Sequence, residues 1–224
     1  MFILEGNIGA GKSTLIAALK KSLPEINFCQ EPVENWQKTD LGDSLLSEFY
    51  QDTKRWSYAM ESFTLMCRVK EMANQLIGKT VVERSVFSGF YCFAKNGYLN
   101  GSMSKLEWEV YNQWFKFFSS CSLKFPLGFI YLKTSPEVCY KRILKRDRQG
   151  ESQITLKYLQ DISSMHDKML LQKKEILPQL QDVPVLVLDA DIEFQDNLSD
   201  LNFFVKAIKN FVEKNSVLPI KIIP

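Results

Sequence analysis

The sequence lacks the features of membrane-spanning and disulfide-rich proteins. No apolar run approaches the roughly 18 residues that a membrane span needs, so we expect no membrane partner. The cysteines are odd in number and include no C-x-x-C pair, which predicts buried thiols in a reducing compartment. They are Cys29, Cys67, Cys92, Cys121 and Cys139.

The sequence also lacks a strong charge, repeats and a targeting segment. A net charge of +2 is too small to indicate a nucleic-acid partner on charge alone. The first apolar strand begins at Phe2, which leaves no room for a signal or transit peptide, so we expect a cytoplasmic protein. With 224 residues, 46% of them hydrophobic, we expect one domain over residues 1–224, with a lid near 142–155 and a tail over 215–224.

The most informative feature present is a glycine-rich loop at the start of the chain. Gly6, Gly11, Lys12 and Ser13 satisfy the pattern G-x-x-x-x-G-K-[ST] of a phosphate-binding loop. An apolar strand precedes this loop and a helical pattern follows it, as the motif requires. Backbone N–H groups and the helix N-terminus would bind the phosphates. Lys12 would reach the terminal phosphates, and the Ser13 hydroxyl would hold Mg²⁺. We therefore expect a nucleoside triphosphate to bind residues 6–14, which are Gly6, Asn7, Ile8, Gly9, Ala10, Gly11, Lys12, Ser13 and Thr14.

Strand and helix patterns alternate along the chain. The predicted strands are Phe2–Glu5, Ile26–Gln30, Thr80–Glu83, Leu127–Leu132 and Val183–Asp189. The predicted helices are Ser13–Leu23, Asp43–Leu76, Ser85–Lys95, Lys105–Ser119, Pro136–Lys145, Leu156–Leu180 and Leu198–Lys214. Continuous apolar strands are typical of a parallel sheet that is covered on both faces. We predict an α/β fold of the P-loop kinase type, with an open parallel five-stranded sheet and an arginine-bearing lid.

Polar side chains follow the predicted strands, and the carboxyl ends of parallel strands are where ligands bind. Phosphoryl transfer needs a metal-bound triphosphate, a carboxylate near the acceptor hydroxyl, and cations around the phosphoryl group. Glu31 is placed to be the carboxylate near the acceptor hydroxyl. Glu83 could hold the Mg²⁺ shell together with Ser13, and Arg84 could bind the acceptor. Arg142 and Arg146 share one helix face and, with Arg148, predict a cationic lid over the phosphates.

Several motifs in order resemble the deoxynucleoside kinases, especially those for deoxycytidine and deoxyguanosine. The motifs are residues 6–14, Glu31-Pro32-Val33 with Trp36, residues 55–58, Glu83-Arg84-Ser85-Val86 and residues 142–148. Residues 106–114 and 129–132 extend the similarity, which covers residues 1 to about 212. The resemblance implies that ATP phosphorylates the 5′-hydroxyl of a deoxynucleoside, that Mg²⁺ is needed, and that helices form a homodimer.

The resemblance also implies roles for individual residues. Glu31 matches the favoured general base, and Glu83 matches a carboxylate at the metal that is sometimes assigned as the base itself. We rank Glu31 first because a carboxylate that is occupied by Mg²⁺ is a poor proton acceptor. Tyr50 and Glu151 fall at the 3′-hydroxyl, Arg84 near the 5′-hydroxyl, and Glu193 and Phe194 at the ATP base. Residues at or around the deoxynucleoside base are Trp36, Leu46, Met60, Glu61, Arg68, Gly89 and Phe93.

Two departures from the family pattern concern the base. Glu61 stands at the position of a base-reading glutamine, and Gly89 stands at the position of an acidic residue that pairs with an arginine, here kept as Arg68. An acceptor-only Glu61 beside a donor-only Arg68 favours a keto base, and Gly89 would leave empty volume beside it. Alternatively, Glu61 and Arg68, two helical turns or about 10.5 Å apart along the axis, pair with each other and specificity is broad.

Three other functions are compatible with a phosphate-binding loop. A thymidylate-type kinase usually carries D-R where this chain has Glu83-Arg84, and its monophosphate acceptor would be repelled by Glu31. A GTPase should show an N/T-K-x-D motif, which the sequence lacks. A non-catalytic regulatory binder should have lost Lys12, Glu31 or Arg84, and all three are present.

Overall fold

The fold is built on five parallel strands, as predicted. The computed structural model describes residues 1–37, 44–74, 79–121, 124–148, 150–194 and 197–216. The strand order is β2-β3-β1-β4-β5, and every pairing is parallel. The strands are β1 (Phe2–Glu5), β2 (Asn27–Cys29), β3 (Thr80–Glu83), β4 (Gly128–Lys133) and β5 (Val185–Asp189).

The helices of the described residues connect these strands in chain order. The longer ones are α1 (Lys12–Ser22), α3 (Leu45–Gln51), α4 (Thr53–Asn74), α7 (Lys105–Cys121), α8 (Pro136–Arg146), α9 (Leu156–Leu170) and α10 (Leu198–Ser216). The short ones are α2 (Glu34–Gln37), α5 (Val86–Ser88), the π-helix η1 (Gly89–Ala94), α6 (Lys95–Leu99) and the 3₁₀ turns η2 (Glu151–Gln153) and η3 (Pro178–Leu180).

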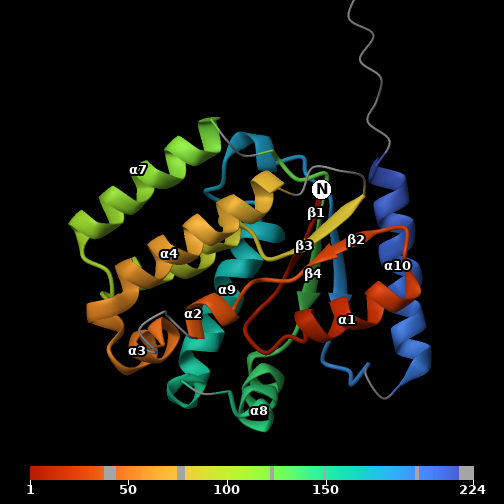
Figure 1. Ribbon diagram of the computed structural model, residues 1–224, viewed down its shortest axis with the longest axis horizontal. Helices are drawn as coiled ribbons and strands as arrows, with labels where there is room; N and C mark the ends of the chain where they lie inside the picture. Colours follow the sequence, from red (N-terminus) through yellow and green to blue (C-terminus); the bar gives the residue numbers. More distant parts are fainter. Residues whose placement is uncertain (38–43, 75–78, 122–123, 149, 195–196, 217–224) are drawn as a thin grey trace, which may run out of the picture.

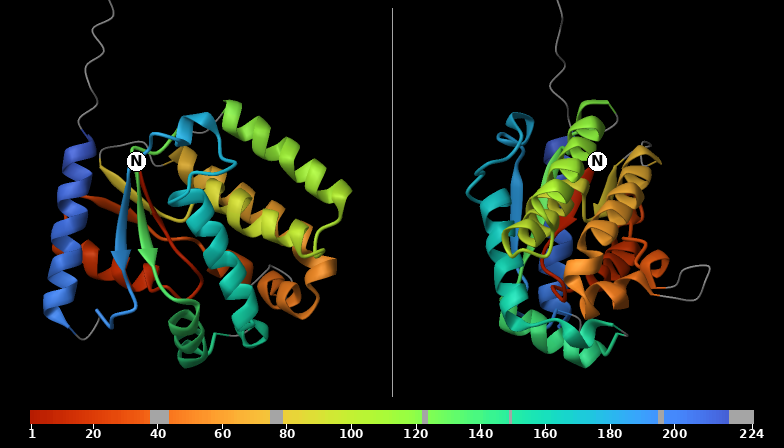
Figure 2. Two further views of the ribbon diagram at one scale, coloured as in Figure 1. Left: turned by 180° about the vertical axis from the view of Figure 1, so that it is seen from behind. Right: turned by 90° about the vertical axis from the view of Figure 1, so that its left-hand side faces the viewer.

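The central strand β1 is buried on both faces because its side chains are all apolar up to Glu5. Phe2 and Leu4 pack into the core with helices α1 and α10, whereas Ile3 packs into the core with α4, α7 and α9. Figures 1 and 2 show α1 and α10 on one side of the sheet and α4, α7 and α9 on the other. The loops that follow the carboxyl ends of the strands therefore lie at the edge of a sheet that helices cover on both faces. These loops can carry functional groups.

Three predicted helices differ from the observed ones. The predicted helix over residues 43–76 is two helices within the described residues, because Asp52 takes a non-helical conformation and its side chain accepts a hydrogen bond from the Arg55 N–H. The predicted helix over 156–180 ends at Leu170, and the chain then turns through positive φ at Lys173 and Glu175. The helix from residue 85 continues to Leu99 and contains the π-helical turn η1. None of the described helices is long and apolar enough to cross a membrane.

Close packing at Gly128 generates a stability prediction. A Cβ atom at Gly128 of β4 would lie 2.7 Å from the ring of Phe211 in α10 and 3.1 Å from the ring of Phe2. Gly128→Ala should therefore lower the free energy of unfolding by about 1–3 kcal/mol through overpacking, measured by urea denaturation. The double variant Gly128→Ala/Phe211→Leu should recover part of this loss. A single variant as stable as the wild type would contradict the packing.

Candidate functional site

The phosphate loop lies at the carboxyl end of β1 and leads into α1. Gly6 and Gly9 have positive φ, and Cβ atoms there would lie 2.7 Å from the Leu132 carbonyl oxygen and 2.6 Å from that of Cys139. Only glycine fits this close approach of backbones. Among the described residues, no side chain caps the N-terminus of α1, so its N–H groups remain available to an anion.

Lys12 folds over this loop. Its ammonium group donates hydrogen bonds to the carbonyl oxygens of Gly6 (3.2 Å) and Asn7 (2.8 Å). Burial lowers the pKa of Lys12 to about 8, and the nearby charge of Arg84 acts in the same direction. A bound anion would stabilise the charged form of this lysine, because it would offset the cost of burial.

Ser13 and Glu83, the residues that the sequence predicts at Mg²⁺, lie in contact, and we call this pair the predicted metal corner. The Ser13 hydroxyl donates a 2.9 Å hydrogen bond to Oε1 of Glu83, at the end of β3. No group of three or more metal-binding side chains occurs in the described parts of the chain. One hydroxyl and one carboxylate fit Mg²⁺, because this ion keeps several waters and binds substrate phosphates besides one or two protein ligands.

Glu31 is held by two arginines. Its Oε1 atom accepts hydrogen bonds from Nε (2.9 Å) and Nη2 (2.7 Å) of Arg68, and Oε2 accepts one from Nε of Arg84 (3.2 Å). Burial alone would raise the pKa of Glu31, but the two guanidinium groups hold it below its usual value. Glu31 is therefore ionised at neutral pH, although its side chain is only 7% exposed.

Arg84 reaches Glu31 from a strained backbone position. Its φ of 64° lies in the left-handed region, which is uncommon for residues with a side chain. Its guanidinium carbon lies 4.6 Å from the centre of the Phe93 ring. Strain of this kind persists only where the surroundings fix it, here through the ion pair, the ring and a hydrogen bond from its N–H to the Leu4 carbonyl.

The expectation of empty volume beside Gly89 is wrong. A Cβ atom at Gly89 would lie 2.6 Å from Nη1 of Arg68, so the arginine fills the space that a side chain would need. Gly89 is absent from the described residues that line the cavity. The alternative pairing of Arg68 with Glu61 is also wrong, because the Arg68 guanidinium binds Glu31 instead. Position 89 carries no acidic side chain that could bind Arg68. Among the described residues, the acid that is hydrogen bonded to Arg68 is Glu31.

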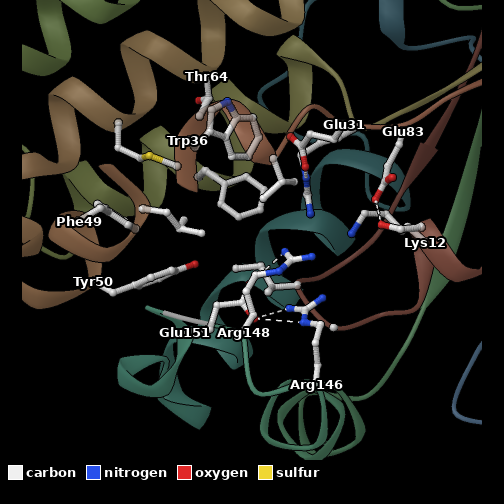
Figure 3. A pocket seen from close by; sticks show the side chains of 18 of the residues that line it. Lys12, Glu31, Trp36, Phe49, Tyr50, Thr64, Glu83, Arg146, Arg148 and Glu151 are labelled. Atoms are coloured by element: carbon white, nitrogen blue, oxygen red, sulfur yellow. Dashed lines mark hydrogen bonds and ion pairs between the residues drawn. The ribbon is translucent and has the colours of Figure 1, made fainter. Parts of the chain in front are cut away.

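The loop, the predicted metal corner and Glu31 open into one cavity with a volume of about 310 Å³. Figure 3 shows Lys12 and Glu83 on one side of this cavity, and Trp36, Phe49 and Tyr50 on the other. Of the phosphate loop, Ile8, Gly9 and residues 11–14 line it, whereas Gly6, Asn7 and Ala10 do not. The other predicted residues that line it are Glu31, Trp36, Leu46, Tyr50, Met60, Glu61, Arg68, Glu83, Arg84, Phe93, Arg146, Arg148 and Glu151.

The cavity also has lining residues that the sequence reasoning missed. They include Val33, Phe49, Thr64 and Tyr158. Thr64 could have been found, because it lies four residues after Met60 and so shares its helix face. Tyr158 gives no such signal, because it comes from α9 and reaches the cavity only through the fold.

The predicted arginine lid divides into two parts. Arg146 and Arg148 both pair with Glu151, whose side chain is 4% exposed, and all three line the cavity. Arg142 does not line this cavity, and its guanidinium donates to the carbonyl oxygens of Ala190 (2.8 Å) and Ile192 (3.0 Å). It thereby anchors the loop that follows β5.

A second hollow of about 270 Å³ lies beside the phosphate loop. Its lining includes Arg142, Arg146, Glu193 and Phe194 together with Gly9, Gly11 and Thr14 of the loop. The structure thus brings the residues expected at the ATP base next to those expected at the phosphates.

A buried pair lies beneath the site. Glu5 and His166 are both fully buried, with Oε2 of Glu5 4.0 Å from Nε2 of His166, and neither atom has a hydrogen-bond partner among the described residues. Nδ1 of His166 lies 2.9 Å from the Ile162 carbonyl oxygen, so Nδ1 must carry a proton. Burial raises the pKa of Glu5 and lowers that of His166 to about 3. His166 therefore presents an unprotonated Nε2 toward Glu5.

Residues 2–213 match the family model for deoxynucleoside kinase. This chain belongs to the deoxynucleoside kinase family. It is 36% identical to a probable deoxycytidine kinase of Fowlpox virus (strain NVSL) over 215 aligned positions, and the alignment covers 94% of this chain and 87% of the relative. It is 34% identical to the deoxycytidine kinase of Mus musculus over 236 aligned positions, gaps included, which cover 93% of this chain and 89% of the relative.

A mitochondrial deoxyguanosine kinase of Xenopus laevis is 32% identical over 231 aligned positions, gaps included, and the alignment covers 91% of this chain and 87% of the relative. The deoxynucleoside kinase is therefore an enzyme that phosphorylates deoxynucleosides with ATP, for nucleotide salvage. This activity excludes the alternative that the chain is a regulatory protein that binds nucleotides without catalysis.

The chain contains a single histidine, so the Glu5–His166 pair can be tested without ambiguity. Because the pKa of His166 is lowered to about 3, its ring should stay neutral from about pH 5 to about pH 8. ¹⁵N NMR of histidine-labelled protein should show a protonated Nδ1 and an unprotonated Nε2 throughout this range. A titrating ring, or a protonated Nε2, would contradict the arrangement.

Proposed function

We propose that the γ-phosphoryl group of ATP passes to the 5′-hydroxyl of the deoxynucleoside with Glu31 as the general base. The observation that carries this proposal is the position of Glu31 between the phosphate loop and the aromatic wall of the cavity. In the step, the hydroxyl oxygen bonds to the γ-phosphorus, the bond to the β-phosphate oxygen breaks, and the hydroxyl proton goes to Glu31. ADP and the deoxynucleoside monophosphate are the products.

The arginines that hold Glu31 fit this role. They keep the carboxylate ionised and pointed at one place, which matters in a reaction that depends on positioning and charge. Their charge also makes Glu31 a weak base. A weak base is sufficient where bond breaking to the leaving group runs ahead of nucleophile attack, because the hydroxyl then loses its proton late.

The remaining charged residues are assigned to the phosphates. We assign Lys12 and the N–H groups of residues 6–14 to the phosphates, and Ser13 with Glu83 to Mg²⁺, which would neutralise developing charge between the phosphates. Arg146 and Arg148 reach the cavity from the lid and are assigned to the phosphoryl group. Glu151, held by these arginines, and Tyr50 are assigned to the 3′-hydroxyl.

We further propose that the base is held in the apolar part of the cavity and that a keto base is preferred. Trp36, Leu46, Met60 and Phe93 supply the flat and apolar surfaces. Arg68 contributes less to base reading than the sequence suggested, because Glu31 takes its Nε and Nη2 donors. The keto preference then depends on Glu61, which in its ionised form accepts hydrogen bonds from ring N–H groups.

Glu31→Gln should lower kcat by about 10²–10⁴-fold, because the amide cannot accept the proton, and should also lower the free energy of unfolding, because Arg68 and Arg84 lose their buried counter-charge. The measurement is ADP release with MgATP and each of four deoxynucleosides, with thymidine monophosphate as an alternative acceptor. Glu34→Gln, an exposed carboxylate three residues away, is the matched control. A kcat for Glu31→Gln within threefold of the wild type would move the base to Glu83.

We propose that the enzyme is a homodimer and that it acts in the cytoplasm. Supporting the dimer, α7 carries exposed Leu106, Val110, Trp114 and Phe117 along one stripe. Supporting the location, Cys29, Cys67, Cys92 and Cys139 are free thiols.

Light scattering should give twice the mass of one chain, and Trp114→Glu should shift the protein toward the monomer by burying a charge in the interface. The matched control is Phe203→Glu, which changes another exposed aromatic residue, on α10, and should leave the protein dimeric. A wild-type monomer at assay concentration would refute the proposed dimer.

A further inference from the structure

Glu61 differs from the other carboxylates of the cavity. Glu31 is held by Arg68 and Arg84, Glu83 by Ser13, and Glu151 by Arg146 and Arg148. Glu61 is only 6% exposed, yet its Oε2 atom has no hydrogen-bond partner among the described residues. An unpartnered buried carboxyl is costly, so a group of this kind that lines a cavity indicates a ligand that completes its hydrogen bonds.

The surroundings of Glu61 are those of a flat ring rather than a phosphate. It lies one turn before Thr64 on α4, and Trp36 and Phe93 line the same cavity. Trp36 and Thr64 lie across the cavity from Lys12 in Figure 3. A base that binds in this part of the cavity, as the proposed function requires, has only its edge left for hydrogen bonding to Glu61.

We propose that Glu61 reads two kinds of base edge, one as a carboxylate and the other as a carboxylic acid. The carboxylate has acceptors only, so it matches the adjacent N1–H and N2–H donors of guanine. The acid has one O–H donor and one C=O acceptor, so it matches the ring nitrogen and amino group of cytosine, as an amide would. This inference rests on the proposed deoxynucleoside site and extends it from one base preference to two.

The groups around Glu61 make both forms accessible near neutral pH. Burial raises the pKa of Glu61 to about 7, although Arg68 and Arg84 lower it and Glu31 raises it further. Since both arginines are hydrogen bonded to Glu31, their attraction for Glu61 is partly compensated. The other titratable groups that interact with Glu61 are the hydroxyls of Tyr50, Tyr111 and Tyr158, from α3, α7 and α9. These phenols stay protonated over this range, because the pKa of each is raised.

The sign of the pH dependence follows directly. Above the pKa of Glu61 the carboxylate dominates and deoxyguanosine is preferred; below it the acid dominates and deoxycytidine is preferred. If each base uses one form, the ratio of the two kcat/KM values rises about tenfold per pH unit, or about 100-fold from pH 6 to pH 8. Titration of Glu31, of Lys12 or of ATP itself affects both substrates and cancels in this ratio.

The experiment measures kcat/KM for deoxyguanosine and deoxycytidine from pH 6 to pH 8.5 with the full chain and saturating MgATP. The ratio should rise with pH in the wild type and in Glu34→Gln. In Glu61→Gln it should be independent of pH and favour deoxycytidine. Deoxyinosine, which lacks the 2-amino group of guanine, should lose part of the advantage above pH 7 in the wild type.

The possible failures can be told apart. A ratio that stays constant with pH in the wild type, with both nucleosides phosphorylated, overturns the two-state reading of Glu61 and leaves the kinase function intact. A ratio that changes equally in Glu61→Gln overturns the assignment of the titrating group to Glu61. Phosphorylation of neither nucleoside at any pH overturns both the proposed function and this inference.

Discussion

The contact of Glu31 with two guanidinium groups organises the whole site. One carboxylate, following β2, binds Arg68 from α4 and Arg84 from the turn after β3. Three segments far apart in the sequence are thus joined at one buried point. Removing one partner would leave an uncompensated buried charge, and such charges are among the most destabilising defects in proteins. The position of Arg84 over Phe93 and the position of Arg68 against Gly89 both follow from this cluster.

Other charged side chains that line the cavity also have ion-pair or hydrogen-bond partners. Glu151 joins the two lid arginines, and Glu83 joins the serine that starts α1. Such pairing holds the side chains in place before phosphates or a metal ion bind, and it lowers the free-energy cost of burying their charges. Lys12 and Glu61 differ, because the lysine is bound by carbonyl groups only and Oε2 of the glutamate has no described partner. A ligand should therefore change the hydrogen bonding of Lys12 and Glu61, at the two ends of the cavity, more than that of the other charged residues.

Local patterns explain which parts of this arrangement were predictable. The strand, loop and helix around Gly6–Ser13 are specified within a dozen residues, and parallel strands then bring Glu31, Glu83 and Arg84 to the same edge. The bounds of β1 and β3 were predicted without error for the same reason, since polar residues end each apolar run. The π-helical turn η1 and the break at Asp52 were missed, because they depend on backbone conformation that apolar periodicity does not encode. The partner of Arg68 was also missed, since two carboxylates competed for it and only the tertiary structure decides between them.

The pairing of the strands has a consequence for the assembly of the protein. β1 precedes both of its neighbours in the chain, and Phe2 aligns with Val81 on one side and with Gly128 on the other. β1 can therefore be paired on both edges only after β4 has been synthesised. The phosphate loop that follows β1 is thus supported by the complete sheet only late in synthesis. Contacts of such long sequence separation slow folding. During synthesis, one edge of an apolar strand would stay unpaired while more than half of the chain emerges, a stage at which chaperones commonly act.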